Sequence, residues 1–385
     1  MTLPKSWSRR FPTLIGAAIL MMAGTLSAAP AKKPFTRGEA TRVIADARKI
    51  GSPSGMERLE KIRIGGIDQW VSIRGRDRRN PVILVIHGGP GYPLMPMSWW
   101  ISRDWEEYFT VVQWDQRGAG KTYMLNDPAK VAPTLSLKRN YADAEEMAQW
   151  VRRELGKKKI FILGHSAGTY AGLEMAMRHP DWIHAYVGVG QIADMPESER
   201  RGWTFAMNAA HRAHNKEAIT QLKAIVPYFA PGHPSPLKDV FIQRKWINVF
   251  GGTMAYRTDN EADSNLARLS PDYTDAELPK LWAGNKFTES ALLLPIVSAD
   301  MSVVKKLDCP LIVMAGRHDY VANSDVAAQW VADIKAPFKQ LVWFEDSGHM
   351  PMTEEPAKFL VSLLRYARPL AERAGDGAPS GISAS

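Results

Sequence analysis

The 385-residue chain has a single cysteine, Cys309, and this scarcity excludes two kinds of site. No intrachain disulfide can form, and no cysteine cluster is present that would bind a structural metal. Cys309 precedes Pro310 at the start of an apolar run, so we expect a small buried thiol rather than a reactive one. The sequence therefore predicts neither a metal nor another cofactor.

Sustained runs of basic residues are also missing, although the formal net charge is +9. Beyond the first residues, the basic side chains occur in short clusters such as Arg76–Arg79 and Lys157–Lys159. Such clusters are typical of a solvated basic face, so we expect no nucleic-acid partner. Hydrophobic residues make up 45% of the chain and charged residues 23%, a composition that permits a sizeable core and excludes wholesale disorder.

Acidic residues are absent from residues 1–31, which have the features of a signal peptide. A basic start is followed by an uncharged apolar stretch, Phe11–Leu26, and then by small residues that resemble a cleavage site, Ala29-Pro30-Ala31. We therefore expect export, with the bacterial periplasm as the destination. The alternative is a membrane anchor formed by residues 11–29 and left uncleaved, because about 18 apolar residues can span a bilayer.

The remaining chain divides according to its hydrophobic pattern, and it contains no internal repeat. Residues 32–55 are expected to form a linker with a short helix. In residues 56–193 and 301–370, strand-like apolar runs alternate with helical spacing, which predicts an α/β fold with a mostly parallel sheet flanked by helices. In residues 194–300 the strand runs vanish and apolar residues recur at helical spacing, so we expect a helical insertion. Residues 371–385 are rich in Ala, Gly and Ser and are expected to be disordered.

The clearest functional signal is the motif F-I-L-G-H-S-A-G at Phe161–Gly168, where a serine stands between an apolar run and a helix-compatible run. Gly164 and Gly168 leave room where side chains would collide with the adjoining strand and helix. This turn would lift the Ser166 hydroxyl clear of the sheet edge. It would also place the Ala167 N–H at a helix N-terminus, where negative charge is stabilised. Ser166 is therefore a candidate nucleophile, and Ala167 is a candidate donor to an oxyanion.

A serine nucleophile needs a base within hydrogen-bond reach and an acid that orients the base. The loops that follow the last two apolar strand runs contain both, Asp319 in one and His349 in the other. Because open α/β sheets place their ligands at the carboxyl ends of the strands, we predict His349 as the base and Asp319 as the acid. One neighbouring base and two neighbouring acids remain as alternatives: His318, Glu345 and Asp346.

The second oxyanion donor is expected in the loop after the apolar run Val82–Ile86, which reads H-G-G-P-G. Glycines let backbone N–H groups approach a substrate oxygen closely. We predict that the Gly89 N–H acts with that of Ala167, and Gly88 is the alternative.

The next strand run is followed by D-Q-R-G-A-G, which contains Asp115 and Arg117. Both side chains could bind substrate. We expect instead a structural ion pair that holds loops together.

Five motifs together resemble those of the α/β-hydrolase superfamily, and more narrowly those of its proline iminopeptidase-like branch. They are H-G-G-P-G at 87–91, D-Q-R-G-A-G at 115–120, G-H-S-A-G at 164–168, G-R-H-D at 316–319 and S-G-H at 347–349. The resemblance covers roughly residues 58–365. It implies an α/β-hydrolase fold in which the helical insertion forms a cap over the site.

The same resemblance implies a catalytic triad of Ser166, Asp319 and His349, with Gly89 and Ala167 as the oxyanion hole. It also implies a cofactor-independent serine hydrolase that forms an acyl-enzyme. Its substrate would be a short peptide or a small molecule, from which it releases an N-terminal prolyl or similar residue. The oligomeric state is not predicted.

Two features of the branch are not matched by residues in this sequence. The peptidases carry tryptophan after the nucleophile, in G-G-S-W-G, where this chain has His165 and Ala167. They also bind the free amine of the substrate with carboxylates of the cap, and no cap acid can be assigned that role from sequence. A carboxylesterase acting on small apolar esters is therefore the main alternative. A non-catalytic binding module on a hydrolase scaffold is the second. The acids of the cap include Glu197, Glu199, Glu217 and Asp239.

Overall fold

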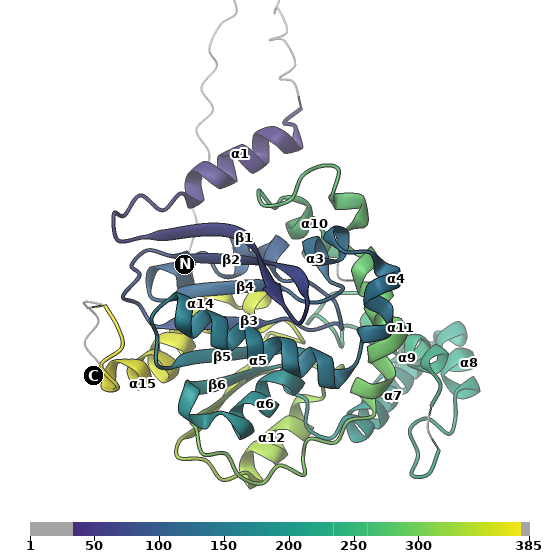
Figure 1. Cartoon of the computed structure of the whole chain (residues 1–385). Coiled ribbons are helices and arrows are strands. Elements are labelled where there is room, and N and C mark those ends of the chain that lie inside the picture. The colour runs from purple at the N-terminus through teal and green to yellow at the C-terminus, as the bar shows by residue number, and fades with distance from the viewer. Residues whose placement is uncertain (1–33, 234, 260, 379–385) are drawn as a thin grey trace, which may run out of the picture. The chain divides into compact units, whose positions relative to one another are not determined.

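The computed structural model describes residues 34–233, 235–259 and 261–378. The expected signal peptide, residues 1–31, lies outside these ranges. The described chain forms one eight-stranded sheet with helices packed on it (Figure 1). The strands are β1 (Met56–Ile64), β2 (Ile67–Gly75), β3 (Val82–Ile86), β4 (Thr110–Asp115), β5 (Ile160–His165), β6 (Ile183–Val189), β7 (Leu311–Gly316) and β8 (Lys339–Phe344).

The strand order is β1-β2-β4-β3-β5-β6-β7-β8. β1 and β2 form an antiparallel hairpin across Gly65-Gly66, and β2 also runs antiparallel to β4. All the other neighbours in the sheet are parallel. The five strands β3 to β7 are buried along their whole length, as expected for a parallel sheet covered on both faces. The predicted α/β class and mostly parallel sheet are therefore confirmed.

Two hydrophobic cores lie on the two faces of the sheet, because successive side chains of a strand point in opposite directions. In β5, Ile160 and Ile162 belong to one core, while Phe161 and Leu163 belong to the other. The first core is covered by α5 (Leu137–Glu154), α6 (Gly168–Arg178) and α12 (Ser324–Asp333). The second is covered by α2 (Ser98–Ile101), α14 (Pro356–Ser362) and α15 (Arg368–Arg373).

Between β6, which ends at Val189, and β7, which begins at Leu311, the chain leaves the sheet for residues 190–310. The two ends of this insertion meet in an antiparallel bridge between Asp194 and Asp300. On both sides of the bridge the backbones are joined, since Met195 N–H donates to Ala299 O at 3.1 Å and Met301 N–H donates to Ala193 O at 2.8 Å. The helices of the insertion are α7 (Met195–Arg212), α8 (Lys216–Ala224), α9 (Leu237–Val249), α10 (Glu261–Arg268) and α11 (Ala283–Val297).

The segment expected to be a linker contains the helix α1 (Arg37–Arg48), and this helix is attached to the core through its last residue. Arg48 is buried, and its Nη2 pairs with Glu106 Oε1 at 3.1 Å. Across the described ranges, no helix is both long enough and apolar enough to cross a membrane.

The expectation of a disordered tail from residue 371 is wrong for residues 371–378. Helix α15 continues to Arg373, and the tail then folds back on the core. His184 Nε2 and Asp376 Oδ2 lie 3.0 Å apart, and Arg368 Nη2 donates to Ala378 O at 2.8 Å. His184 lies on β6 and Arg368 on α15, outside the tail itself. The composition of the tail therefore does not show that the tail has partners.

Candidate active site

Ser166 lies in the sharp turn between β5 and α6, where its φ is +52°. Residues other than glycine rarely adopt this conformation. The turn is held by the Ser166 N–H, which donates to Val189 O on the neighbouring strand at 2.8 Å. A Cβ at Gly168 would lie 2.1 Å from Ile86 O, and a Cβ at Gly164 would lie 2.9 Å from Gly168 O. The two glycines of G-x-S-x-G therefore allow β3, β5 and α6 to approach closely around the serine.

His349 and Asp319 lie in the loops after β8 and β7 and contact each other directly. The His349 Nδ1 donates to Asp319 Oδ2 at 2.7 Å. Asp319 Oδ1 accepts the backbone N–H groups of Val321 and Ala322 at 2.8 and 3.0 Å. Because the carboxylate is held on both oxygens, it fixes the orientation of the imidazole. Nε2, the nitrogen that a base would use, has no hydrogen-bond partner among the described residues.

Two contacts bring His349 beside the turn that holds Ser166. His165, the residue before the serine, donates from Nε2 to the backbone oxygen of His349 at 3.0 Å, and the two rings lie 5.0 Å apart. Gly190 follows the residue that accepts the Ser166 N–H, and a Cβ there would lie 2.8 Å from His349 Cε1. The three side chains predicted from distant parts of the sequence are thus gathered at one edge of the sheet.

His165 is a donor that stays uncharged near neutral pH. Burial, together with the positive charge that His349 can carry, lowers the pKa of His165 to about 3. The backbone oxygen of His349 can only accept a hydrogen bond, so the proton of neutral His165 resides on Nε2. No role for His165 is predicted from the sequence, and in the structure its side chain connects the serine turn to the histidine loop.

The three alternative residues have other partners at the surface. His318 Nε2 and Asp346 Oδ1 each lie 3.2 Å from the Tyr256 hydroxyl. Glu345 forms an ion pair with Arg317 at 2.9 Å. Of the three acids considered, Asp319 is therefore the one whose carboxylate is hydrogen-bonded to His349.

The H-G-G-P-G loop passes next to the nucleophile. A Cβ at Gly88 would lie 2.6 Å from Ser166 Cβ and 3.3 Å from the Ala167 nitrogen. Gly89 has φ of +114°, a conformation that strongly favours glycine. Within the described chain, neither the Gly89 N–H nor the Ala167 N–H has an intramolecular acceptor. Both groups are therefore available to a substrate oxygen.

Hydrogen bonds between His87 and Gln116 hold the H-G-G-P-G loop to the loop after β4. The Gln116 N–H donates to His87 Nε2 at 3.2 Å, so the proton of His87 resides on Nδ1, which lies 3.0 Å from Gly88 O. The Gln116 side chain also donates to His87 O at 2.7 Å. Burial lowers the pKa of His87 to about 4, which keeps the ring neutral and preserves this arrangement near neutral pH.

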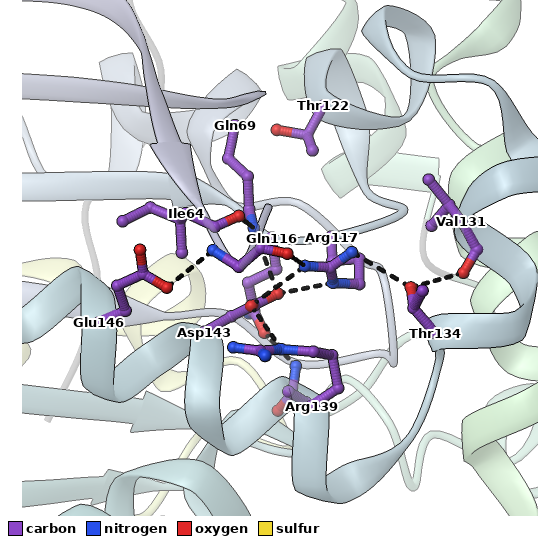
Figure 2. Close-up of polar contacts among 12 residues, drawn as sticks. Ile64, Gln69, Gln116, Arg117, Thr122, Val131, Thr134, Arg139, Asp143 and Glu146 are labelled. Atoms are coloured by element: carbon purple, nitrogen blue, oxygen red, sulfur yellow. Dashed lines mark hydrogen bonds and ion pairs between the residues drawn. The ribbon is translucent and has the colours of Figure 1, made fainter. Parts of the chain in front are cut away.

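Arg117 has a structural role, as expected, but its partner is Asp143 on α5 and not Asp115. Figure 2 shows the guanidinium lying between Asp143 and Thr134. Arg117 Nε and Nη2 bond the two carboxylate oxygens at 2.7 and 3.1 Å, and Nη2 also donates to Gly65 O at 2.8 Å. The residue thus joins the loop after β4 to α5 and to the β1–β2 turn.

Asp115 is fully buried and has no ion-pair partner among the described residues. Its Oδ2 accepts the Lys121 N–H at 2.8 Å and the hydroxyl of Tyr273, which comes from the insertion. Burial raises the pKa of Asp115 to about 7. Asp115 therefore fastens a segment of the insertion to the end of β4.

Most of the acids noted in the insertion are occupied by local pairs. Glu197 pairs with Arg200 and Arg201, Glu217 pairs with Lys245, and Glu199 is bound by Arg244 and by the Tyr228 hydroxyl. The pairs of Glu197 are typical of a helical surface, whereas Glu199 is fully buried.

Asp263 on α10 is different, and sequence reasoning missed it. It is 3% exposed, and its Oδ1 has no hydrogen-bond partner in the described part of the chain. Burial raises the pKa of Asp263 to about 6, although positive charge on Arg257 and His349 acts in the opposite direction. Burial raises the pKa of Tyr92, just after the glycine loop, and the negative charge of Asp263 raises it further. Asp263 is thus within electrostatic range of both loops of the candidate site.

A small cavity lies beside the glycine loop. Its walls come from that loop, from the serine turn and from α11 of the insertion, and they include Gly88, Pro90, Ala167, Leu292 and Ile296. The insertion therefore contributes apolar surface next to the proposed oxyanion donors, as expected of a substrate pocket.

Comparisons with known proteins agree with this architecture. A family described as "alpha/beta hydrolase fold" matches residues 81–356. The probable aminopeptidase YbaC of Bacillus subtilis (strain 168) is 26% identical over 317 residues, 80% of this chain and 96% of that protein. The proline iminopeptidase of Heyndrickxia coagulans is 23% identical over 283 residues, 72% of this chain and 87% of that protein. The crystal structure of proline iminopeptidase from Mycobacterium smegmatis matches with a TM-score of 0.60 at 17% identity, covering 82% of this chain and 100% of that one.

Proposed function

This chain belongs to the α/β-hydrolase superfamily, and on that basis we propose that it is a serine hydrolase whose nucleophile is Ser166. The observation that carries the proposal is the 2.7 Å bond between His349 Nδ1 and Asp319 Oδ2 at the edge of the sheet that also holds Ser166. Such a bond leaves His349 Nε2 as the nitrogen that can accept a proton.

In the proposed reaction, His349 Nε2 takes the hydroxyl proton as Ser166 Oγ attacks the substrate carbonyl carbon. The carbonyl oxygen becomes an oxyanion, which the N–H groups of Gly89 and Ala167 stabilise. His349 then gives the proton to the leaving group, and the bond to that group breaks. Water attacks the resulting acyl-enzyme with His349 again acting as base, and Ser166 is regenerated.

We infer further that the substrate is a short peptide or amide with a free N-terminal amine, as in the aminopeptidases to which the chain is similar. Asp263 supports this inference. A buried carboxylate that has an oxygen without a partner among the described residues is stabilised by an ammonium group. Because Asp263 is within electrostatic range of His349, an amine bound to it would lie near the reacting carbonyl.

The substrate class is tested with prolyl-naphthylamide and other aminoacyl naphthylamides assayed beside p-nitrophenyl esters. Cleavage of the aminoacyl amides by the wild type, abolished in Ser166→Ala, is the expected result. Fast ester turnover without any amide cleavage would instead identify the carboxylesterase that remains the alternative.

A fluorophosphonate probe separates the hydrolase from a non-catalytic binding module, because the probe reacts only with an activated serine. We expect one adduct, on Ser166, in the folded wild type. Folded protein that forms no adduct would contradict the hydrolase proposal.

We also propose that residues 1–31 direct the chain to the bacterial periplasm. The basic start, apolar stretch and small residues of that segment support export. Mass spectrometry of the mature N-terminus in fractionated cells tests this, with a soluble periplasmic chain beginning near residue 32 as the expected result. Membrane-bound protein that retains Met1 would instead support an anchor at residues 11–29.

A further inference from the structure

A loop of the insertion, residues 251–257 between α9 and α10, is hydrogen-bonded to both loops of the proposed triad. The His349 N–H donates to Thr253 O at 2.7 Å. The Tyr320 N–H, next to Asp319, donates to Gly252 O at 2.9 Å. The backbone of the insertion is therefore part of the support of the proposed base and of its acid.

These loops are also in close steric contact. A Cβ at Gly348 would lie 2.4 Å from Thr253 O, so the histidine loop can approach residue 253 only because residue 348 is glycine. On the other side, a Cβ at Gly252 would lie 3.2 Å from the Cβ of Tyr320, the residue next to Asp319. A shift of loop 251–257 would therefore be transmitted directly to the residues beside His349.

Glu354, the last residue of α13 (Pro351–Glu354), joins loop 251–257 to the loop of His349 through its carboxylate. Its Oε1 accepts the Ala255 N–H of the insertion at 2.7 Å. Its Oε2 accepts the N–H groups of Gly348 and Met350, the two neighbours of His349, at 2.9 and 3.3 Å. One side chain thus bonds loop 251–257 and the backbone N–H groups of the residues on either side of the proposed base.

We propose that Glu354 is a positioning residue, which fixes His349 for catalysis by tying its loop to the insertion. This proposal rests on the proposed function. A carboxylate suits the task because both of its oxygens accept hydrogen bonds. Glutamine has one acceptor oxygen, and its NH₂ group would meet an N–H donor either at Ala255 or at Gly348 and Met350. The tie is then broken on one side, and a misplacement of about 1 Å in a reacting group costs about 100-fold in rate.

The test compares Glu354→Gln with Glu106→Gln on the full mature chain. Glu106 is the control, because it is also a carboxylate with hydrogen-bond donors on both oxygens, Arg48 and Arg74, and it is more deeply buried than Glu354. It precedes β4, so it lies at the amino end of that strand, away from the proposed site.

In Glu354→Gln we expect kcat to fall about 10- to 100-fold, with KM changed less than twofold and with slower fluorophosphonate labelling of Ser166. Glu106→Gln should keep the wild-type kcat even where its melting temperature falls. A general loss of stability would affect both variants, whereas a positioning role affects kcat only in the first.

Folded Glu354→Gln with kcat within twofold of the wild type would overturn the proposal. Should that variant fail to fold, Gly348→Ala decides, because its methyl group pushes loop 251–257 away from His349 and is expected to lower kcat by a similar factor. An active Gly348→Ala at wild-type kcat would overturn the proposal as well. Failure of the proposed function is a separate result, seen as activity that survives in Ser166→Ala.

Discussion

The imidazole of His165 donates a hydrogen bond to the backbone oxygen of His349, 184 residues further along the chain. This bond joins the side chain of the residue that precedes the proposed nucleophile to the backbone of the proposed base. Together with the bond from the His349 N–H to Thr253 O, it holds both backbone groups of His349 in place. Preorganisation of this kind is what a base needs to meet a serine hydroxyl at hydrogen-bond distance.

Replacing His165 by alanine should therefore impair catalysis without removing any reacting group. His165→Ala leaves the His349 oxygen without its side-chain donor and opens a gap beside the imidazole ring. We expect kcat to fall about 10- to 100-fold. Steady-state kinetics at saturating substrate measures kcat. Circular dichroism establishes that the variant is folded. Unchanged kcat in folded protein would show that this bond does not position His349.

Asp319→Asn should keep the fold and remove most of the activity. The asparagine oxygen can still accept the N–H groups of Val321 and Ala322, but its NH₂ group would face His349 Nδ1. That contact favours the tautomer with the proton on Nε2, which cannot act as a base. We expect kcat to fall about 10⁴-fold. Asp346→Asn is the matched control and should retain activity, since Asp346 bonds the exposed Tyr256 hydroxyl. The reverse ranking of the two variants would assign the acid to Asp346.

Asp263→Asn should raise KM for aminoacyl substrates and also stabilise the fold. The pKa of Asp263 is about 6 in the folded chain, above the ordinary value of 3.8. Burial of its charge therefore costs nothing below pH 3.8, and the cost grows up to about pH 6 and is fully present above it. At pH 7 the neutral amide removes this cost, which is about 3 kcal/mol. At pH 4 the gain should be small. Urea denaturation at pH 7 and pH 4 measures the difference in the free energy of unfolding between Asp263→Asn and the wild type.

The same substitution has a kinetic signature. In the wild type, KM for an aminoacyl amide should rise as the pH falls through about 6, since the protonated carboxyl no longer attracts the ammonium group. Asp263→Asn should show a high KM throughout this range, while the surface variant Asp239→Asn should behave as the wild type. Four other ionisable groups interact electrostatically with Asp263: Arg257, His349, Tyr92 and Glu354. The KM values of the variant and the wild type are therefore compared at the same pH. Equal KM values in Asp263→Asn and the wild type would exclude this residue from amine binding.

Arg117→Met should destabilise the fold and leave the chemistry intact. The variant leaves Asp143, 1% exposed, without the guanidinium that bonds both of its oxygens (Figure 2). Asp143 keeps its ion pair with Arg139 at 2.8 Å, so we expect a loss of about 1.5 to 3 kcal/mol in the free energy of unfolding. Arg178→Met removes an exposed pair with Glu174 and should cost less than about 1 kcal/mol. Equal losses in the two variants would contradict the structural role, and a normal stability with lost kcat would make Arg117 a substrate residue.

The sequence by itself determined the α/β class, the helical character of the insertion and the order of the motifs. These properties depend on local patterns: continuous apolar runs for buried parallel strands, helical spacing in the insertion, and glycines where the turn around Ser166 admits no side chain. The candidate residues Ser166, Asp319 and His349 were found in the same way, because each follows a recognisable strand run.

Tertiary structure decided the partners. That Asp319 and not Asp346 bonds His349, that Arg117 pairs with Asp143, and that Glu354 bonds the insertion all depend on contacts between distant segments. Asp263 looks like any other cap acid in the sequence. It differs only because the fold buries it with an oxygen that has no partner among the described residues. Burial and long-range hydrogen bonds are properties of the folded chain, and no local pattern encodes them.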